Sequence, residues 1–188
     1  RLATDKYIQP GDSVLDVGFG LGYGLRIMAE NAGDLRGVEI DRRAVRQGQR
    51  LCREAPKISE LIRYDGQTIP YDDDAFDVVT CIDVIEHVPD YVALISEMTR
   101  VSNRVVVLST PNRRPEYTRT DGKPKNRWHL REWSYEELNA ILHRIPDVRV
   151  AWNFLNGPWD GPFERTSIVV ETTMALTPAL MVSSSEGS

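Results

Sequence analysis

A short loop rich in glycine constrains the fold of this chain more than any other feature. Three glycines alternate with other residues in residues 16–22, and the loop directly follows the apolar pair Val14 and Leu15. Glycine is favoured where a turn needs a positive φ or where the backbone must come close to a ligand. We therefore expect a buried strand that ends in the carboxylate of Asp16 and runs into a ligand-binding turn. The glycines of this turn are Gly18, Gly20 and Gly22.

The spacing of these glycines indicates which ligand the turn binds. The dinucleotide-binding fingerprint places its glycines at the first, third and sixth positions of a motif. Counted from Gly18 the sixth position is Tyr23, and counted from Gly20 it is Leu25. The spacing therefore disfavours a nicotinamide-dependent dehydrogenase. Asp16 would also repel a pyrophosphate, whereas a carboxylate suits a ligand that carries positive charge.

The loop resembles motif I of the class I S-adenosylmethionine-dependent methyltransferases, in particular their type 11 and type 23 members. Three later segments resemble the following blocks of this family in the same order, namely residues 37–41, 63–71 and 76–82. Phe19 and Leu21 depart from the small residues that are usual in the loop, but neither replaces a glycine. The resemblance implies that the ligand is S-adenosyl-L-methionine, which carries an ammonium and a sulfonium.

The resemblance also assigns roles to residues at the ends of the expected strands. Glu39 would accept hydrogen bonds from the ribose hydroxyls, and Asp65 would meet the adenine amino group. Asp16 and the glycine loop would hold the amino-acid end, and Ile82 with Asp83 would line the methyl side. The expected cofactor-binding residues are Asp16, Gly18, Gly20, Gly22, Glu39, Ile40, Asp65, Gly66, Ile82 and Asp83.

Strands alternate with helical patterns along most of the chain, which predicts an α/β fold with a mostly parallel sheet and helices on both faces. No helix-length pattern separates residues 148–154 from residues 167–171, so these two strands should form an antiparallel hairpin at the end of the chain. The resemblance implies the same ending for a doubly wound, Rossmann-like sheet of seven strands. The other expected strands are residues 14–17, 35–40, 61–64, 77–82 and 104–109.

Polar residues indicate where two of the helices begin. Asp90 is a candidate N-cap, because its carboxylate can accept from the first free backbone N–H groups of a helix. Ser134 and Glu137 have the spacing of a capping box. The helix after Asp90 should bury the apolar residues of one side. These residues are Val92, Leu94, Ile95 and Met98.

Length and composition set the organisation of the chain. A chain of 188 residues fits one domain, which we expect at residues 13–172, after an N-terminal remnant (1–12) and before a partly disordered tail (173–188). The formal net charge of −5 argues against a generally basic nucleic-acid binder. Cys52 and Cys81 lack metal-like spacing, and neither a membrane-spanning run nor a secretory signal is evident. We therefore expect a cytoplasmic monomer or homodimer that has no membrane as a partner.

Two histidines are the candidate catalytic residues. His87 follows the fourth strand, where the resemblance places the reacting methyl group, and a histidine can take a proton from a hydroxyl near neutral pH. His129, on a later loop, is the second candidate. A hydroxyl acceptor has to lose its proton, which a base can take. We therefore expect O-methylation of a small molecule or saccharide, and Asn112 could orient this acceptor. Alternatively, His87 bonds the backbone and only shapes the cofactor pocket.

A divalent metal is a further hypothesis for this region. The pattern of Asp83, Glu86, His87 and His129 resembles two metal-dependent subfamilies, the ubiquinone-biosynthesis O-methyltransferases and the small-RNA 3′-terminal 2′-O-methyltransferases. Carboxylates together with imidazoles would suit Mg²⁺ or Mn²⁺. Metal-free relatives carry similar segments, and Asp83 is one methylene shorter than the usual glutamate, so we expect a site with no metal and keep the metal site as the alternative.

The loop from Arg113 to Arg131 is the basic region of this acidic chain. Aromatic residues, Tyr117 and Trp128, lie between its cations, and such a mixture can clamp phosphates and stack on bases or sugar rings. An RNA 3′ end or a nucleotide-linked sugar would fit, and an ordinary solvated loop is the alternative. The alternatives to a small-molecule methyltransferase are thus a metal-dependent RNA 2′-O-methyltransferase and a cofactor-binding module without activity. The cations are Arg113, Arg114, Arg119, Lys123, Lys125, Arg127 and Arg131.

Overall fold

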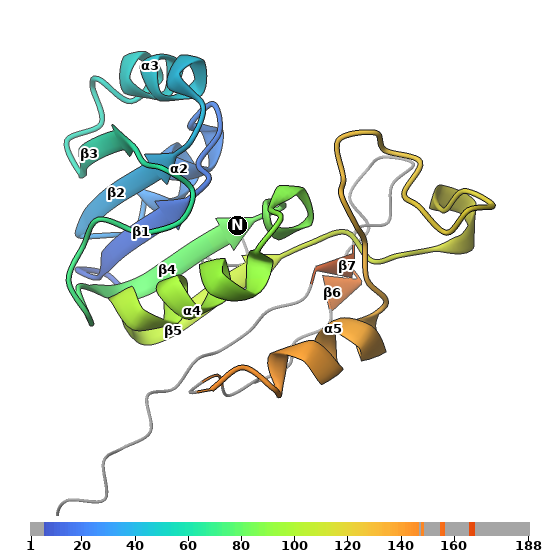
Figure 1. Cartoon of the computed structure of the whole chain (residues 1–188). Coiled ribbons are helices and arrows are strands. Elements are labelled where there is room, and N and C mark those ends of the chain that lie inside the picture. The colour runs from blue at the N-terminus through green and yellow to red at the C-terminus, as the bar shows by residue number, and fades with distance from the viewer. Residues whose placement is uncertain (1–5, 147, 149–154, 157–165, 168–188) are drawn as a thin grey trace, which may run out of the picture.

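A computed structural model describes residues 6–146, 148, 155–156 and 166–167. Within these residues, five strands form one parallel sheet in the order β3-β2-β1-β4-β5 (Figure 1). The five expected strands of the parallel part are confirmed, with boundaries that differ by at most three residues. The strands are β1 (Ser13–Val17), β2 (Asp34–Glu39), β3 (Ile58–Arg63), β4 (Phe76–Ile82) and β5 (Ser102–Ser109).

The strand order reverses between β1 and β4, which are neighbours in the sheet although β2 and β3 separate them in the chain. Their parallel register places Asp16 opposite Thr80. In open α/β sheets, ligands bind outside the carboxyl ends of the strands at such a reversal. The Rossmann-like α/β fold is therefore confirmed for the described part of the chain, and the reversal indicates where to look for the site.

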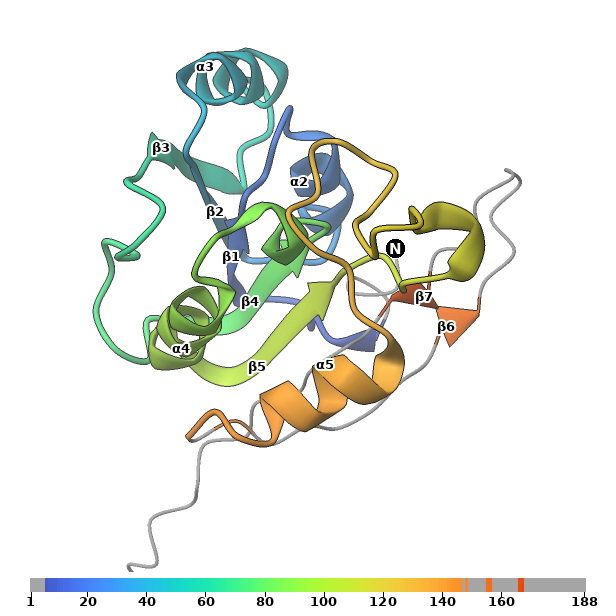
Figure 2. The ribbon, with the colours of Figure 1, turned by 45° about the vertical axis from the view of Figure 1, so that its right-hand side comes forward.

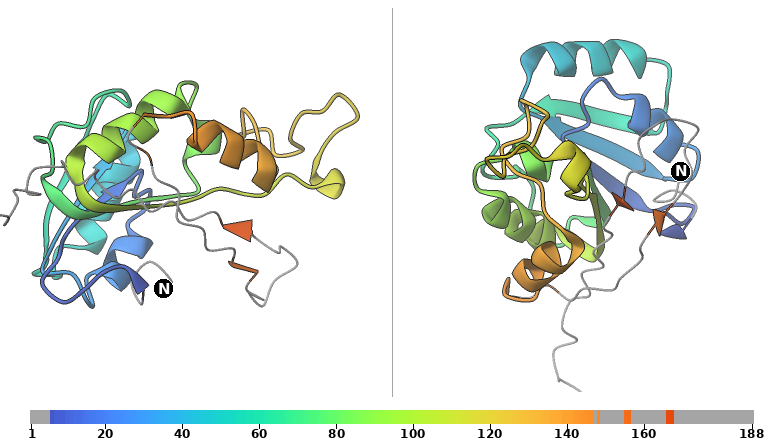
Figure 3. Two further views of the ribbon diagram at one scale, coloured as in Figure 1. Left: turned by 90° about the horizontal axis from the view of Figure 1, so that it is seen from below. Right: turned by 90° about the vertical axis from the view of Figure 1, so that its right-hand side faces the viewer.

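Helices cover both faces of the sheet. Figure 2 shows α3 beside β3 at one margin of the molecule and α5 at the opposite margin, beyond β5. Figure 3 shows α4 and α5 on one side of β4 and β5, with α2 on the other side. The helices are α2 (Tyr23–Met28), α3 (Arg42–Leu51), α4 (Tyr91–Val101) and α5 (Tyr135–Leu142), with the single-turn 3-10 helices η1 (Ile85–His87) and η2 (Pro115–Tyr117).

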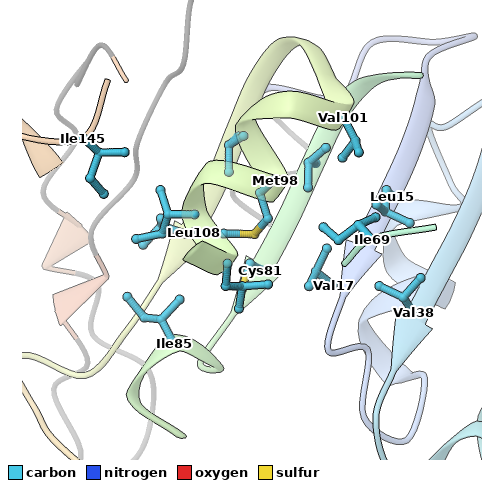
Figure 4. Close-up of a cluster of buried hydrophobic side chains, with 14 of the residues drawn as sticks. Leu15, Val17, Val38, Ile69, Cys81, Ile85, Met98, Val101, Leu108 and Ile145 are labelled. Carbon is cyan, nitrogen blue, oxygen red and sulfur yellow. The ribbon is translucent and has the colours of Figure 1, made fainter. Parts of the chain in front are cut away.

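The alternation of side chains along β1 divides the core into two clusters. Leu15 and Val17 pack in the cluster that includes the buried residues of α4 and α5 (Figure 4). Val14 belongs to the second cluster, which contains buried residues of α2 and α3. Tyr7 and Ile8, from the expected N-terminal remnant, are buried in this second cluster as well. These two residues are thus part of the packed domain.

Both expected helix caps are confirmed. The Asp90 carboxylate accepts a hydrogen bond from the N–H of Ala93 at 3.0 Å, and Ser134 forms the full capping box at the start of α5. The expected inward position of Val92 is wrong, because its side chain is 38% exposed whereas Leu94 is buried. At about 100° per residue, Val92 lies roughly 200° around the helix from Leu94 and therefore faces away from the core.

The two final strands of the expected sheet lie mostly outside the described residues. Residues 149–154 and 168–171 are not described, so the seven-stranded sheet stays a prediction. The described pair β6 (Leu155–Asn156) and β7 (Thr166–Ser167) is antiparallel and forms a separate two-stranded ladder. The expected disordered tail also lies outside the described residues. Among the described helices, none combines the length and apolarity that crossing a bilayer requires.

Candidate cofactor and active site

The glycine turn follows β1 as expected. Gly18, Gly20 and Gly22 have φ angles of 75°, 55° and 87°, which lie in the region that favours glycine. The N–H of Gly18 donates to the carbonyl of Val38 at 2.8 Å, and the N–H of Gly20 donates to Oε2 of Glu39 at 3.0 Å. The turn is therefore fixed against the end of β2, and the two segments build one surface.

Phe19, the unusual residue of the turn, is buried. Its ring occupies the space that two glycines leave open, Gly37 on β2 and Gly48 on α3. A Cβ atom at either position would come within 2.6 Å or 2.7 Å, respectively, of a ring carbon of Phe19. The turn is thus anchored by an aromatic ring that packs between the sheet and α3.

Asp16 is a buried carboxylate at the end of β1. The Thr80 hydroxyl donates to its Oδ1 at 2.7 Å. Burial, with a smaller effect from the nearby Glu39, raises the pKa of Asp16 to about 6 although the Thr80 hydrogen bond opposes this shift. A cation bound beside this carboxylate would stabilise its ionised form. The electrostatics therefore fit a positively charged ligand.

Glu39 ends β2 with both carboxylate oxygens oriented by the backbone. Its Oε2 accepts from the N–H of Gly20, and its Oε1 accepts from the N–H of Asp41 at 2.9 Å. The side chain is buried. Each carboxylate oxygen can accept more than one hydrogen bond. Glu39 can therefore receive two hydroxyls from a sugar without losing the bonds that position it.

Exposed apolar side chains follow two of the strands at the same end of the sheet. Ile40, after β2, is 55% exposed, and Ile82, the last residue of β4, is 44% exposed. Gly66 lies against Ile40, since a Cβ at Gly66 would be 3.2 Å from its Cγ2. Oδ1 of Asp65 accepts from two backbone N–H groups, which lowers the pKa of this carboxyl. Apolar faces beside a fixed carboxylate suit a heterocyclic base with an amino group.

Asp83 lies between this region and a cavity that it helps to line. Its φ of 55° is unusual for a residue other than glycine. Its N–H donates to the carbonyl of Ser109 at 2.9 Å, and the Ser109 hydroxyl donates to its Oδ1 at 2.9 Å. Backbone strain of this kind clusters at functional sites. The bonds to β5 hold the Asp83 carboxylate at the carboxyl end of β4.

A cavity of about 520 Å³, which we call the acceptor pocket, opens next to Asp83. This volume lies in the range that small-molecule sites have. Its walls come from the turn after β4, the end of β5 and the loop from Arg113 to Arg131 with the residues that follow it. The polar side chains that line it include Asp83, Glu86, His87, Asn112, His129 and Glu132.

His87 is oriented by the backbone of the long loop. Its Nδ1 lies 2.8 Å from the carbonyl oxygen of Trp128. A carbonyl only accepts, so Nδ1 carries the proton and Nε2 of the neutral ring has a free lone pair. Nε2 lies 3.9 Å from Oε1 of Glu86, and the His87 side chain is 42% exposed. His87 can therefore accept a proton from a molecule in the pocket.

His129 is held in the same tautomer by two side chains. Its Nδ1 lies 2.6 Å from Oε1 of the buried Glu132, and its Nε2 lies 2.7 Å from the amide nitrogen of Asn126. The carboxylate accepts and the amide donates, so the proton of the neutral ring is on Nδ1. The rings of His87 and His129 meet edge to face, with their centroids 4.9 Å apart. The structure thus brings both expected catalytic residues together.

Comparison with known proteins agrees with this geometry. The profile of a family described as methyltransferase domain matches residues 15–105. A ubiquinone biosynthesis O-methyltransferase of Psychrobacter arcticus is 35% identical over 114 residues, which are 56% of this chain and 43% of that protein. The chain belongs to the class I S-adenosylmethionine-dependent methyltransferases.

Two further similarities extend this result. A demethylmenaquinone methyltransferase of Lysinibacillus sphaericus is 32% identical over 109 residues, 55% of this chain and 46% of that protein. This methyltransferase chain therefore spans less than half the length of the two relatives. The YcgJ protein of Bacillus subtilis has the same fold, with a TM-score of 0.69 and 20% identity, over 82% of this chain and 68% of that one.

The expected metal ligands of this methyltransferase come together only in part. Ligand atoms of Glu86, His87 and His129 lie within 4.8 Å of one another, while Asp83 is held by Ser109 instead. Glu86 is fully buried, and its Oε1 has no hydrogen-bond partner among the described residues. Burial, and to a lesser degree the Asp83 charge, raise the pKa of the Glu86 carboxyl. The donor set fits a divalent cation, although His129 would have to give up its bond to Asn126.

The basic loop uses most of its cations within the protein. Arg131 donates to the carbonyls of Val88 and Pro89 and lies over the Tyr91 ring, which fastens the loop to the start of α4. The other contacts of the loop cations are ion pairs of Arg113 with Glu137, Arg114 with Glu116 and Arg119 with Asp121, a bond from Lys125 to the Glu116 carbonyl, and Arg127 over the Trp128 ring. Among the described residues, only Arg113, Arg114 and Arg119 of these cations pair with a carboxylate, so four positive charges of the loop stay without an acidic partner.

Sequence patterns alone do not identify three residues of the site. Thr80 is the partner of Asp16 only because the register of β1 and β4 places them side by side. The Thr110 hydroxyl donates to Oε2 of Glu86 at 3.0 Å from the end of the neighbouring strand. Glu132 has a local signal, since it follows His129 by three residues, but only the structure shows the hydrogen bond between them.

Proposed function

We propose that this protein transfers a methyl group from S-adenosyl-L-methionine to a hydroxyl oxygen of a small acceptor in the acceptor pocket. The observation that supports this most is the pair His87 and His129, which line a cavity beside Asp83, with the Nε2 lone pair of His87 free to take a proton. A quinone-type ring is the favoured acceptor, because two relatives are named for ubiquinone biosynthesis and for demethylmenaquinone. Tyr117 and Trp128 add flat aromatic faces to the pocket. A saccharide hydroxyl is the wider alternative.

The cofactor-binding residues contribute alignment. Bound S-adenosyl-L-methionine supplies a methyl group on a positively charged sulfur. Asp16 would bind its ammonium, Glu39 its ribose hydroxyls, and Asp65 the amino group of its adenine. Charge is dispersed in this kind of transfer, so orientation of the two reactants is the main contribution of the protein.

His87 would remove the acceptor proton. Its Nε2 takes the proton, while its Nδ1–H stays bonded to the Trp128 carbonyl. The imidazolium that forms lies near Oε1 of Glu86, 3.9 Å from Nε2. A positive charge there favours the ionised form of Glu86 against the burial that raises the pKa of this carboxyl. Glu86 therefore stabilises the charge that His87 acquires.

The test is the double variant His87→Gln with His129→Gln. General bases contribute roughly 10²–10⁴-fold to a rate, so kcat should fall by about this factor on a dihydroxybenzene or short-chain quinol acceptor. Calorimetry should show unchanged affinity for S-adenosyl-L-methionine, because neither histidine holds the cofactor in this assignment. Full turnover by the double variant would refute the role of the histidines.

The acceptor class is tested by a panel. Methyl transfer is followed by mass spectrometry with soluble quinols, with saccharides and with RNA oligonucleotides that end in a free 2′-hydroxyl. Transfer to quinols above the other two classes supports the proposal. Cofactor binding without transfer to any class would favour a module without activity, and an absorbance change with a nicotinamide cofactor would favour a dehydrogenase.

A metal-dependent RNA 2′-O-methyltransferase is the second candidate. The cluster of Glu86, His87 and His129 favours it, whereas the ion pairs that three of the seven loop cations form within the protein do not. The distinguishing measurement is turnover after treatment with EDTA and after addition of Mg²⁺ or Mn²⁺. Strict dependence on the metal, with an affinity for RNA that falls steeply with salt, would select this candidate over a metal-free enzyme.

A further inference from the structure

Helix α3 carries an unusual arrangement of arginines on its outer side. Four of its ten residues are arginine, and one more arginine lies in the turn that follows. At 100° per residue, the four helical arginines fall within an arc of about 100°, and Val45 and Gly48 point to the buried side. All five are exposed. We call them the arginine stripe: Arg42, Arg43, Arg46, Arg50 and Arg53.

The positive charge of the arginine stripe is not neutralised by partners within the described residues. None of its five side chains has an ion pair or hydrogen bond within the described part of the chain. Arg42 and Arg43 open the helix, where the macrodipole disfavours positive charge. Arg46 has an arginine four residues before it and another four residues after it, and like charges at this spacing destabilise a helix. Helix stability therefore does not explain the stripe, and an external anion would.

The stripe is also separate from the acceptor pocket. Helix α3 lies at the margin of the molecule beside β3, whereas α5 lies at the opposite margin (Figures 2 and 3). The residues that line the acceptor pocket come from other segments. The whole chain has a formal net charge of −5, so this concentration of positive charge opposes the average sign of the protein.

We propose that the arginine stripe docks the protein on the surface of an anionic phospholipid bilayer. Guanidinium groups match phosphate oxygens in a bidentate way, and their long stems can reach toward a surface. The apolar side of α3 is in the core, so the helix does not insert and the attraction is electrostatic. The choice of a membrane rests on the proposed quinone-type acceptor, because ubiquinone and menaquinone carry isoprenoid tails that dissolve in bilayers.

A nucleic acid is the competing polyanion. Proteins that bind single strands interleave aromatic residues with cations, so that bases stack on the rings. Between Arg42 and Arg53 the exposed residues are arginines and glutamines, and there is no aromatic residue in this segment. The straight outer side of a ten-residue helix, about 15 Å long, can instead contact a flat surface along its whole length.

The test is sedimentation with vesicles, without acceptor and without turnover. The full chain should bind vesicles of phosphatidylcholine with about one third phosphatidylglycerol, should not bind phosphatidylcholine alone, and should be released at roughly 0.5 M salt, where surface charges are screened. The variant Arg46→Gln, Arg50→Gln, Arg53→Gln should bind roughly 100-fold more weakly, from about fivefold for each arginine. The matched control Arg119→Gln, Lys123→Gln, Arg144→Gln removes the same charge elsewhere and should bind as the wild type does.

Three outcomes would overturn the proposal. They are equal binding to both kinds of vesicle, an equal loss in the control variant, and stronger retention of the wild type on a structured RNA than on anionic vesicles at the same salt. Affinity for S-adenosyl-L-methionine, measured for both variants, shows that each is folded. Because the vesicle assay needs no methyl transfer, its failure is distinguishable from a failure of the proposed reaction.

Discussion

Buried carboxylates determine the electrostatics of the end of the sheet where we expect the cofactor to bind. Asp16, Glu39 and Glu86 are all buried, and among the described residues none of them pairs with an arginine or lysine. Their hydrogen-bond donors are hydroxyl or backbone N–H groups. Burying a charge is costly unless it is compensated. The apoprotein therefore carries an electrostatic cost that a bound cation relieves.

The pH dependence of stability should report this cost at Asp16. Burial raises the pKa of Asp16 from 3.8 to about 6, so between these values the folded state holds a proton that the unfolded state has lost. The contribution of this bound proton to the free energy of unfolding is complete below about pH 4 and is lost as the pH rises through 6. Two pKa units correspond to about 3 kcal/mol. The free energy of unfolding of Asp16→Asn, relative to the wild type without cofactor, should thus increase by up to about 3 kcal/mol from pH 4 to pH 7.

Urea denaturation at each pH measures this difference. The control Asp72→Asn replaces an exposed acid and should keep the pH profile of the wild type. A difference between Asp16→Asn and the wild type that stays constant from pH 4 to pH 7 would contradict the assignment. The variant should also bind S-adenosyl-L-methionine more weakly, because the ammonium loses its carboxylate.

Glu132 is a positioning residue, which acts through its hydrogen bond with His129. The 2.6 Å contact keeps the His129 proton on Nδ1, so that Nε2 accepts from the Asn126 amide at the pocket wall. Glu132→Gln can present its amide N–H to that nitrogen and favour the other tautomer, so kcat should fall at least roughly tenfold while KM changes little. Steady-state kinetics with the matched variant Glu116→Gln, on the exposed part of the loop, provide the control. Recovery of kcat in Glu132→Asp would support positioning, and an unchanged kcat in Glu132→Gln would exclude it.

Among the secondary-structure elements, α5 depends on its cap. The Ser134 hydroxyl accepts from the N–H of Glu137, and the Glu137 carboxylate accepts from the N–H of Ser134. Replacing a serine N-cap by alanine costs about 1 kcal/mol, so Ser134→Ala should lower the free energy of unfolding by this amount. Ser96→Ala, on the exposed side of α4, is the control and should change it by less than about 0.5 kcal/mol. Equal effects of the two substitutions would mean that the cap does not stabilise α5.

The strands of the parallel sheet are the elements that the sequence specifies best. β1 and β4 are short, mostly apolar runs that a turn closes, so the sequence predicts both to within a residue of their bounds in the structure. The start of β5 was missed by two residues, because Ser102 and Asn103 carry no apolar signal, although Ser102 pairs with Phe76 in the sheet. Local pattern predicts that a strand exists, whereas its ends depend on the neighbouring strand.

The candidate site was predictable to the extent that it is made of strand ends. Asp16, Glu39 and Asp83 were expected at one edge because carboxyl ends of parallel strands meet there. Thr80 and Thr110 were not, because a hydroxyl in an apolar strand gives no sign of which carboxylate it faces. The partners of the loop arginines could not be predicted from the sequence either, because Arg113 pairs with Glu137, which lies 24 residues away.

The sheet, the glycine turn and α3 are packed as one unit through the Phe19 ring. Gly37 on β2 and Gly48 on α3 both border this ring, so the cofactor turn contacts two other segments at a single side chain. Close-packed interiors transmit strain when volume is added. A change on α3 should therefore reach the cofactor site through Phe19.

Gly48→Ala tests this coupling. Alanine in place of glycine normally stabilises a helix by about 1 kcal/mol, but here its Cβ would lie 2.7 Å from Cε2 of Phe19. Overpacking costs about 1–3 kcal/mol, so we expect Gly48→Ala to lower the free energy of unfolding and the affinity for S-adenosyl-L-methionine. In a Phe19→Leu background the penalty should shrink, which gives a coupling energy of at least about 0.5 kcal/mol in a double-mutant cycle. Gln47→Ala, on the exposed side of α3, should show no coupling with Phe19→Leu, and the same absence for Gly48→Ala would mean that the ring does not join these segments.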